Sequence, residues 1–226
     1  MAEGAGSATA RAAYAYYSMN PRLRLTLMAG ATIVLLGILA FLLLSDPGAN
    51  GSRLPATRFA GAIRPDSPPA RFALHDQDGK LITAASLRGQ PVIVAFMYST
   101  CQNDCPTMAQ QIRGALDRLG RDVPVVAISV DPARDTLASA QRFLAAQHLG
   151  GRMNFLLGSE QQLQPVWREF GIEPQKTGRE HTAIVVLLDA DGHQRIGFPL
   201  SELTPEGIAH DVRVLEREAA AQKSSN

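Results

Sequence analysis

The longest uncharged stretch of the sequence divides the chain into two unequal parts. Twenty residues, Leu25 to Leu44, read LTLMAGATIVLLGILAFLLL and contain no charged side chain. A helix rises about 1.5 Å per residue, so a run of this length reaches about 30 Å, the thickness of the hydrocarbon core of a bilayer. The sequence therefore predicts a transmembrane helix over residues 25–44, with the folded domain on its C-terminal side.

The flanks of this stretch favour an uncleaved anchor and predict its orientation. The apolar region of a signal peptide is usually about 7–15 residues and ends in a small-residue cleavage site, whereas this run ends Leu-Leu-Leu-Ser-Asp-Pro. Arg11, Arg22 and Arg24 precede the run and Asp46 follows it, so the positive-inside rule places residues 1–24 in the cytoplasm. Because so few arginines make a poor mitochondrial presequence, we expect a single-pass protein of a bacterial inner membrane with a periplasmic C-terminal domain.

Composition excludes several classes of protein. The 22 basic and 21 acidic residues give a formal net charge of +1, which excludes a strongly polycationic nucleic-acid binder. With 46% hydrophobic and 19% charged residues, the chain can bury a core and is not expected to be disordered. Two cysteines are too few for a multi-disulfide scaffold or a four-cysteine zinc site.

The exported part begins with a linker and continues as one domain. Residues 45–70 contain five prolines and three glycines and predict a partly extended linker. Residues 71–219 are expected to form the domain, and residues 220–226 a tail. Asp78-Gly79 between short apolar runs predicts a β-hairpin, while residues 91–98 and 123–130 are continuous apolar runs typical of strands buried on both faces. Residues 182–189 and 194–198 predict a pair of antiparallel strands around Asp191-Gly192.

Four helices are expected between and after these strands. They begin near Pro106, after Asp131-Pro132, at a capping box formed by Ser159 and Gln162, and at Thr204-Pro205. Their predicted inward positions are Met108, Ile112, Ala115 and Leu119; Leu137, Ala140 and Leu144; Leu163, Val166, Trp167 and Phe170; and Ile208, Val212 and Leu215. This order of elements predicts an α/β domain with a thioredoxin-like fold and an added N-terminal β-hairpin.

The two cysteines lie in the loop YSTCQNDCPT, between a buried strand and a helix. Functional groups collect at the carboxyl ends of parallel strands, and unpaired N–H groups at a helix start favour a thiolate. Cys101 and Cys105 could be inert core residues, but the polar residues between them disfavour burial. A structural disulfide would close only a five-residue loop and add little stability. A reactive or metal-binding pair is the better interpretation, and spacing alone does not choose between these two.

A third ligand is predicted at a neighbouring strand end. His181 stands directly before the strand at residues 182–189, beside the cysteine loop in the predicted sheet. Two thiols and one imidazole suit copper better than calcium or magnesium, and the lack of a fourth cysteine disfavours structural zinc. Asp131 ends the second buried strand at the same edge, where it could cap a helix or lie in the outer shell of the site. The other histidines and Met97, Met108 and Met153 are expected to be structural.

Three motifs, STCQNDCPT, AISVDPARDT and REHTAIVVLLDADG, resemble the SCO/SenC family. The resemblance implies a membrane-anchored, thioredoxin-fold protein that binds copper and assists assembly of the dinuclear copper centre of cytochrome c oxidase subunit II. It also implies that Cys101, Cys105 and His181 ligate copper. The acidic signature of the family falls on Asp131, Pro132, Arg134, Asp135 and Thr136. Gln102 and Asp104 depart from the usual loop, which has proline after the first cysteine and an apolar residue before the second.

Three functions can be built on a thiol pair in such a domain. The first is a copper chaperone that holds Cu(I) or Cu(II) and passes it to oxidase subunit II, supported by a periplasmic copper donor or thiol reductant. The second is a thiol-disulfide reductase in which Cys101 and Cys105 form the catalytic redox pair and keep the cysteines of the oxidase subunit reduced. The third, a peroxiredoxin, is disfavoured because its motif requires proline where Phe96 stands. None of these functions involves nucleic acid.

Overall fold

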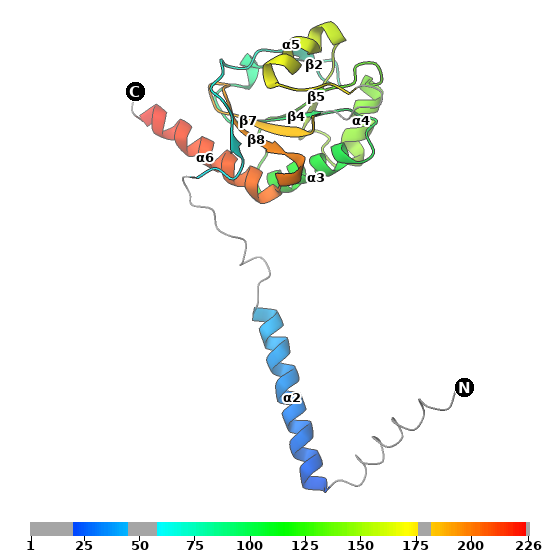
Figure 1. The fold of residues 1–226 in the computed structure, drawn as a ribbon, viewed down its shortest axis with the longest axis vertical. Helices are drawn as coiled ribbons and strands as arrows, with labels where there is room; N and C mark the ends of the chain where they lie inside the picture. Colours follow the sequence, from blue (N-terminus) through cyan, green and yellow to red (C-terminus); the bar gives the residue numbers. More distant parts are fainter. Residues whose placement is uncertain (1–19, 45–57, 176–181, 225–226) are drawn as a thin grey trace, which may run out of the picture. The chain divides into compact units, whose positions relative to one another are not determined.

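The computed structural model describes residues 20–44, 58–175 and 182–224, in two units, Met1–Arg53 and Leu54–Asn226. The first unit contains the helix α2 (Pro21–Leu44), drawn in blue in Figure 1. The side chain of Asn20 accepts a hydrogen bond from the backbone N–H of Arg22 at this helix start. Within the described ranges, no helix meets the length and apolarity needed to cross a membrane, so the predicted transmembrane helix is not confirmed.

The second unit has an α/β architecture. Its elements are β1 (Ala62–Ile63), β2 (Ala73–His75), β3 (Leu81–Thr83), η1 (Ala85–Leu87), β4 (Val92–Met97), α3 (Asp104–Leu119), β5 (Val125–Ser129), α4 (Leu137–Ala146), β6 (Asn154–Leu156), α5 (Glu160–Phe170), β7 (Ile184–Leu188), β8 (Gln194–Pro199), η2 (Leu200–Glu202) and α6 (Pro205–Ser224).

A six-stranded mixed sheet forms the centre of this unit, in the order β1-β8-β7-β4-β5-β6. Figure 1 labels four of its strands, β4, β5, β7 and β8. The strands β4, β5 and β6 are parallel, whereas β7 is antiparallel to both β4 and β8. The strands β2 and β3 pair separately as an antiparallel hairpin. The prediction of an α/β domain with an N-terminal hairpin is confirmed.

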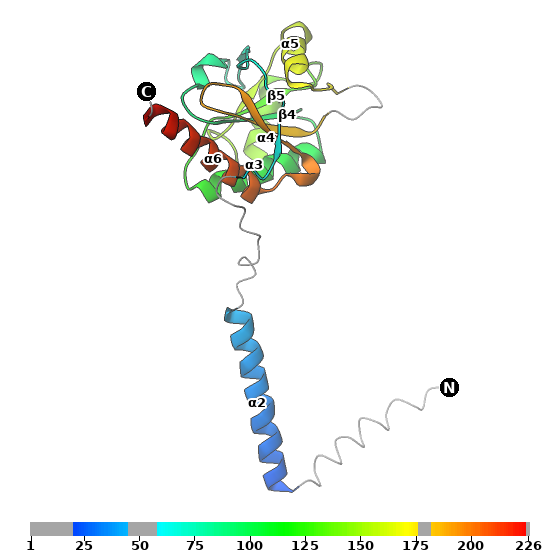
Figure 2. The ribbon, with the colours of Figure 1, turned by 60° about the vertical axis from the view of Figure 1, so that its left-hand side comes forward.

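Each face of the sheet carries its own hydrophobic core. One core contains residues of α3, α4 and α6, and the other contains residues of the β2–β3 hairpin and α5. Figure 2 shows α5 and the pair α3 and α6 on opposite sides of the sheet. All six residues of β4 are buried, and they alternate between the two cores: Met97 faces the first, and Phe96 the second. A strand covered on both faces explains the uninterrupted apolar run in the sequence.

The predicted helices are confirmed with corrections at two starts. The capping box of Ser159 and Gln162 opens α5, and the predicted inward residues of α5 and α6 are buried. The helix α3 begins at Asp104, two residues before Pro106. The helix α4 begins at Leu137, with Thr136 rather than Asp131 as its cap. The prediction that Leu137 faces inward is wrong: the side chain stands at the exposed end of the helix and is 50% exposed.

Two short strands were not predicted. The three-residue β6 extends the parallel part of the sheet beyond β5, and the apolar run at this position, Phe155 to Leu157, is too short to predict a strand. The strand β1 lies within the proline-rich stretch predicted to be a linker, and it pairs with β8 through Ala62 and Gly197. We call residues 59–64, which include β1, the N-terminal strap.

The N-terminal strap is fastened to the last helix by a buried carboxylate. Asp211 of α6 is fully buried, and its oxygens accept the backbone N–H groups of Ala60 at 2.8 Å and Gly61 at 2.9 Å. A Cβ atom on Gly61 would come within 2.5 Å of Ile196, so only glycine allows this close approach to β8. The strap therefore belongs to the packed domain.

Candidate functional site

The cysteine pair lies where β4 gives way to α3. Cys101 is half-buried in the loop and Cys105 is buried in the first turn of α3, and both are free thiols. The Cys101 backbone N–H donates to the Tyr98 carbonyl at 3.3 Å, and the Cys105 backbone N–H donates to Cys101 Sγ at 3.3 Å. The Asn103 side chain makes no capping hydrogen bond, so the sulfur of Cys101 takes the acceptor position at this helix end. The predicted location of Cys105 at a helix start is confirmed.

The two thiols have opposite acidities. A hydrogen bond from the Cys105 thiol, outweighing the effect of burial, lowers the pKa of Cys101 to about 5, with further help from nearby backbone N–H groups and the Tyr98 hydroxyl. Its hydrogen bond to Cys101, together with burial, raises the pKa of Cys105 far above its ordinary value. The pair therefore shares one proton near neutral pH, with the negative charge on Cys101. A metal ion that bound both sulfurs would displace this shared proton.

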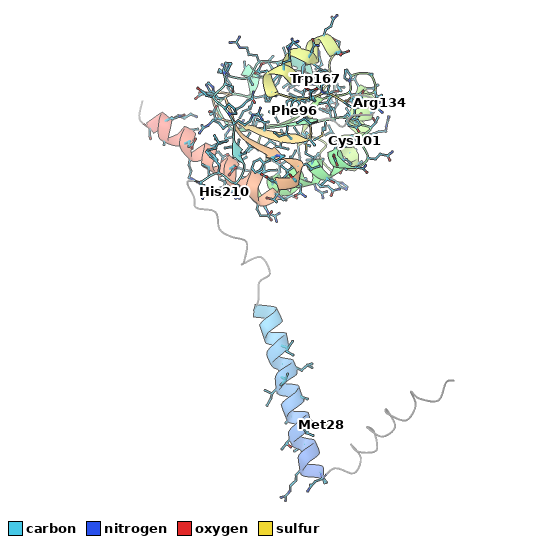
Figure 3. All side chains as sticks on the ribbon, viewed as in Figure 1. Met28, Phe96, Cys101, Arg134, Trp167 and His210 are labelled. Carbon is cyan, nitrogen blue, oxygen red and sulfur yellow. The ribbon has the colours of Figure 1, made fainter. Side chains whose placement is uncertain are left out.

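Tyr98 contacts the thiol pair, and Arg134 in turn contacts Tyr98. Burial, together with the hydrogen bond to Cys101, raises the pKa of Tyr98 to about 12, so its phenol stays protonated and donates to the Cys101 sulfur. The Arg134 guanidinium lies 5.6 Å from the centre of the Tyr98 ring, within range of a cation–π interaction. Figure 3 shows Cys101 and Arg134 at the same end of the domain. The sequence interpretation missed Tyr98, although its position directly after β4 was a usable signal.

Asp131 lies at the same edge but is engaged elsewhere. Its carboxylate pairs with Arg134 Nε, and its carbonyl accepts the backbone N–H groups of Arg134 and Asp135 at 3.1 and 3.0 Å. A hydrogen bond from Val130 N–H to the Met97 carbonyl brings the ends of β5 and β4 together. Asp131 thus follows the strand end that is bonded to the end of β4, where it organises the turn before α4 and does not cap that helix.

His181 lies outside the described residues. On one flank, Gln175 N–H donates to the Val130 carbonyl at 2.9 Å. At the base of the segment, Thr182 N–H donates to the Glu173 carbonyl at 3.2 Å, and Glu173 N–H donates to Thr182 Oγ1 at 3.1 Å. The residues flanking 176–181 are therefore joined to one another and to the end of β5. Within residues 20–44, 58–175 and 182–224, no three histidine, cysteine or acidic side chains gather as a metal site.

The methionines considered as alternative ligands lie in the core. Met97, Met108 and Met153 are all buried, and they belong to the core on the α3 face of the sheet. His193 uses Nδ1 to contact the Ser67 carbonyl at 2.8 Å, and His210 uses Nδ1 to contact Asp211 at 2.8 Å. These side chains are structural, as predicted.

Fold and site together define the class: a thioredoxin-like α/β domain with a thiol pair at a strand-to-helix junction. Residues 62–216 match the sequence model of the SCO1/SenC family, and the chain belongs to this family. The resemblance seen in the three motifs is thereby confirmed.

Individual relatives agree with this assignment. Protein SCO1 homolog 1, mitochondrial, of Arabidopsis thaliana is 31% identical over 119 residues, which are 51% of this chain and 35% of that protein. The structure of Bradyrhizobium japonicum ScoI with copper bound is 33% identical with a TM-score of 0.56, and the match covers 65% of this chain and 98% of that one. BsSco, a member of the Sco family of cytochrome c oxidase assembly proteins with a disulfide switch, is 24% identical with a TM-score of 0.58 over 66% of this chain and 94% of that one, a likeness of fold alone.

Proposed function

We propose that this chain is a copper-binding protein that assists assembly of cytochrome c oxidase, and that Cys101, Cys105 and His181 hold the copper. The observation that carries the proposal is the thiol pair at the start of α3, where the Cys105 backbone N–H donates to Cys101 Sγ at 3.3 Å and the hydrogen bond from the Cys105 thiol lowers the pKa of Cys101 to about 5. Thiolates are soft donors that suit copper, and imidazole completes a set able to hold either Cu(I) or Cu(II). The copper bound to the Bradyrhizobium relative supports the same metal here.

The surroundings of His181 support its part in the proposal. Its flanking residues are joined to the carbonyl of Val130, and Val130 is in turn bonded to Met97, from which the cysteine loop departs. The described residue before this segment, Gln175, is therefore bonded at the same edge of the sheet from which the cysteine loop departs. The proposed client is oxidase subunit II, whose dinuclear copper centre would receive the metal by ligand exchange. Asp131 is proposed as an outer-shell group that orients Arg134 over Tyr98.

Copper loading of the full-length chain tests the ligand set. We expect the wild type to retain one copper per chain after desalting, and Cys101→Ser or Cys105→Ser to retain none. His181→Ala should weaken Cu(II) binding by about a hundredfold, because it removes one of few ligands. His148→Ala is the matched control, since His148 is exposed and lies at the end of α4. Full copper retention by both cysteine variants would contradict the proposal.

The membrane location is proposed from the sequence alone. Residues 25–44 lack charge, and the arginines on their N-terminal side predict a cytoplasmic N-terminus and a periplasmic domain. The full chain should stay in the membrane fraction after an alkaline carbonate wash. Replacing Leu35 and Leu36 with arginine should release it, because each central charge costs about 2.5–3.5 kcal/mol on insertion. Release of the wild-type chain by the same wash is the contrary result.

A further inference from the structure

A half-buried carboxylate next to the cysteine loop is not used by the proposed copper site. Asp135 Oδ1 accepts hydrogen bonds from the Ser99 backbone N–H at 2.7 Å and from the Ser99 hydroxyl at 2.6 Å. Its other oxygen, Oδ2, accepts from the Ser129 hydroxyl at 2.5 Å. Three donors thus converge on one carboxylate from two different strand ends.

The bonds of Asp135 join three elements of the fold. Ser99 belongs to the loop after β4, Ser129 is the last residue of β5, and Asp135 itself precedes the cap of α4. The Ser99 hydroxyl also lies 2.7 Å from the Ser139 hydroxyl of α4. The carbonyl of Ser129 accepts from Trp167 Nε1 at 2.9 Å, which fixes the end of β5 against α5. Ser99 is therefore tied to a rigid part of the domain.

The tie matters because it links the cysteine loop to β5 and α4, whereas the backbone N–H groups of Cys101 and Cys105 bond within the loop itself. Ser99 stands two residues before Cys101, whose backbone N–H donates to the nearby Tyr98 carbonyl. The contact between Cys101 Sγ and the Cys105 backbone requires the loop to fold back onto α3. With Ser99 fixed, the loop has fewer conformations to lose when it brings Cys101 Sγ to the Cys105 backbone. Burial raises the pKa of Asp135, while the bonds from Ser129 and Ser99 oppose this shift, so the carboxylate is held at a cost in solvation.

We propose that Asp135 is a positioning residue that, through Ser99, holds Cys101 within reach of Cys105. This proposal rests on the proposed function, because a preset distance between the two sulfurs matters when both sulfurs bind one metal ion. The geometry between the thiols can also be measured without metal, so the two proposals are separable.

The metal-free test is the equilibrium of the full chain with glutathione. Formation of the Cys101–Cys105 disulfide joins the two sulfurs and passes two electrons and two protons to oxidised glutathione, which becomes two thiols. The equilibrium constant measures the effective concentration of one thiol at the other. We expect Asp135→Ala to lower this constant about tenfold, the effect of losing hydrogen bonds to a charged acceptor. Asp135→Asn, which keeps an oxygen for Ser99, should recover most of it.

A second experiment measures the absorption of the same variants after copper loading. The charge-transfer absorption between thiolate and Cu(II) should shift or broaden in Asp135→Ala and return in Asp135→Asn. Ser159→Ala is the matched control, because it removes the capping box of α5 and touches nothing in the cysteine loop. Trp167 is the only tryptophan in the sequence and is bonded to Ser129, so unchanged emission shows that the end of β5 is intact.

A double variant decides whether Asp135 acts through Ser99. Ser99→Ala removes the hydroxyl donor, and its effect should overlap that of Asp135→Ala, so that the double variant is less affected than the product of the two predicts. Independent effects, or a glutathione equilibrium in Asp135→Ala equal to that of the wild type, overturn the positioning role. A chain that shows the expected glutathione shift but binds no copper keeps the positioning role and refutes the proposed function.

Discussion

Two carboxylates, Asp211 and Asp135, each hold a distant stretch of chain, but they do so with different donors. Asp211 is fully buried and binds two backbone N–H groups of the N-terminal strap and the ring of His210. Asp135 is half-buried, and two of its three donors are serine hydroxyls, which can rotate. Asp211 therefore holds the N-terminal strap in one fixed arrangement, and we call this contact the clamp. Asp135 supports the cysteine loop through bonds that can adjust.

The largest effect expected from this comparison is on the clamp. Asp211→Ala removes the acceptor of the half-buried N–H groups of Ala60 and Gly61 and leaves a cavity at a fully buried position, so it should lower the free energy of unfolding by about 3–5 kcal/mol. Urea unfolding of the full chain, followed by Trp167 emission, measures this loss. Asp66→Ala, at an exposed position of the same polypeptide, is the control and should be near neutral. A loss below about 1 kcal/mol for Asp211→Ala contradicts the clamp.

A smaller effect is expected at the cysteine loop, where the reactivity of the Cys101 thiol can be measured as a function of pH. The thiolate is the nucleophile, so alkylation of Cys101 in the metal-free chain should fall as the pH drops below about 5, the depressed pKa of Cys101. Tyr98→Phe removes one donor to the sulfur, which destabilises the thiolate and should move this midpoint upward by about half to one unit. The rate of iodoacetamide modification between pH 4 and 9 provides the measurement.

Asn103→Ala is the control for this pH profile. The backbone N–H of Asn103, and not its side chain, supports the thiolate, so the variant keeps the donor. Its midpoint should stay at the wild-type position. An unchanged midpoint in Tyr98→Phe would show that the phenol does not stabilise the thiolate.

The smallest effect is expected for the exposed end of α4. Leu137 is 50% exposed whereas Leu144 is 2% exposed, although both were predicted to face the core. Leu137→Ala should therefore change the free energy of unfolding by no more than about 0.5 kcal/mol, and Leu144→Ala should cost about 2–4 kcal/mol. Equal losses in the two variants, measured by urea unfolding, would restore the inward placement of Leu137.

The error at Leu137 shows what the apolar pattern can predict. Spacing alone puts Leu137, Ala140 and Leu144 on one face, but it does not say where the helix begins. The turn built by Asp131 and Arg134 delays the helix until Thr136 caps it. Long buried runs such as residues 91–98 were predictable because burial on both faces leaves no alternation to misread. The strands β1 and β6 were not, because a pairing of two or three residues depends on the neighbouring strand.

Some residues of the candidate site could also be predicted from the sequence, and others could not. Loop position and helix chemistry were enough to single out Cys101 and Cys105, and the structure confirms their contact. The predicted ligand role of His181 stays a prediction, since that residue lies outside the described ranges. The supporting roles of Tyr98 and Asp135 depend on distances between strand ends that are far apart in sequence, and periodicity carries no information about them.

The pairing of β1 with β8 also affects when the domain can fold during synthesis. The strap at Ala60 is held by Asp211, 151 residues later in the chain, and Ala62 pairs with Gly197. Contacts between such distant segments form late and slow folding. During synthesis, the strap must wait for the last helix to leave the ribosome, or the export channel if the domain is translocated. Truncating the chain before Asp211 would therefore remove the acceptor that holds the N-terminal strap as well as most of the last helix.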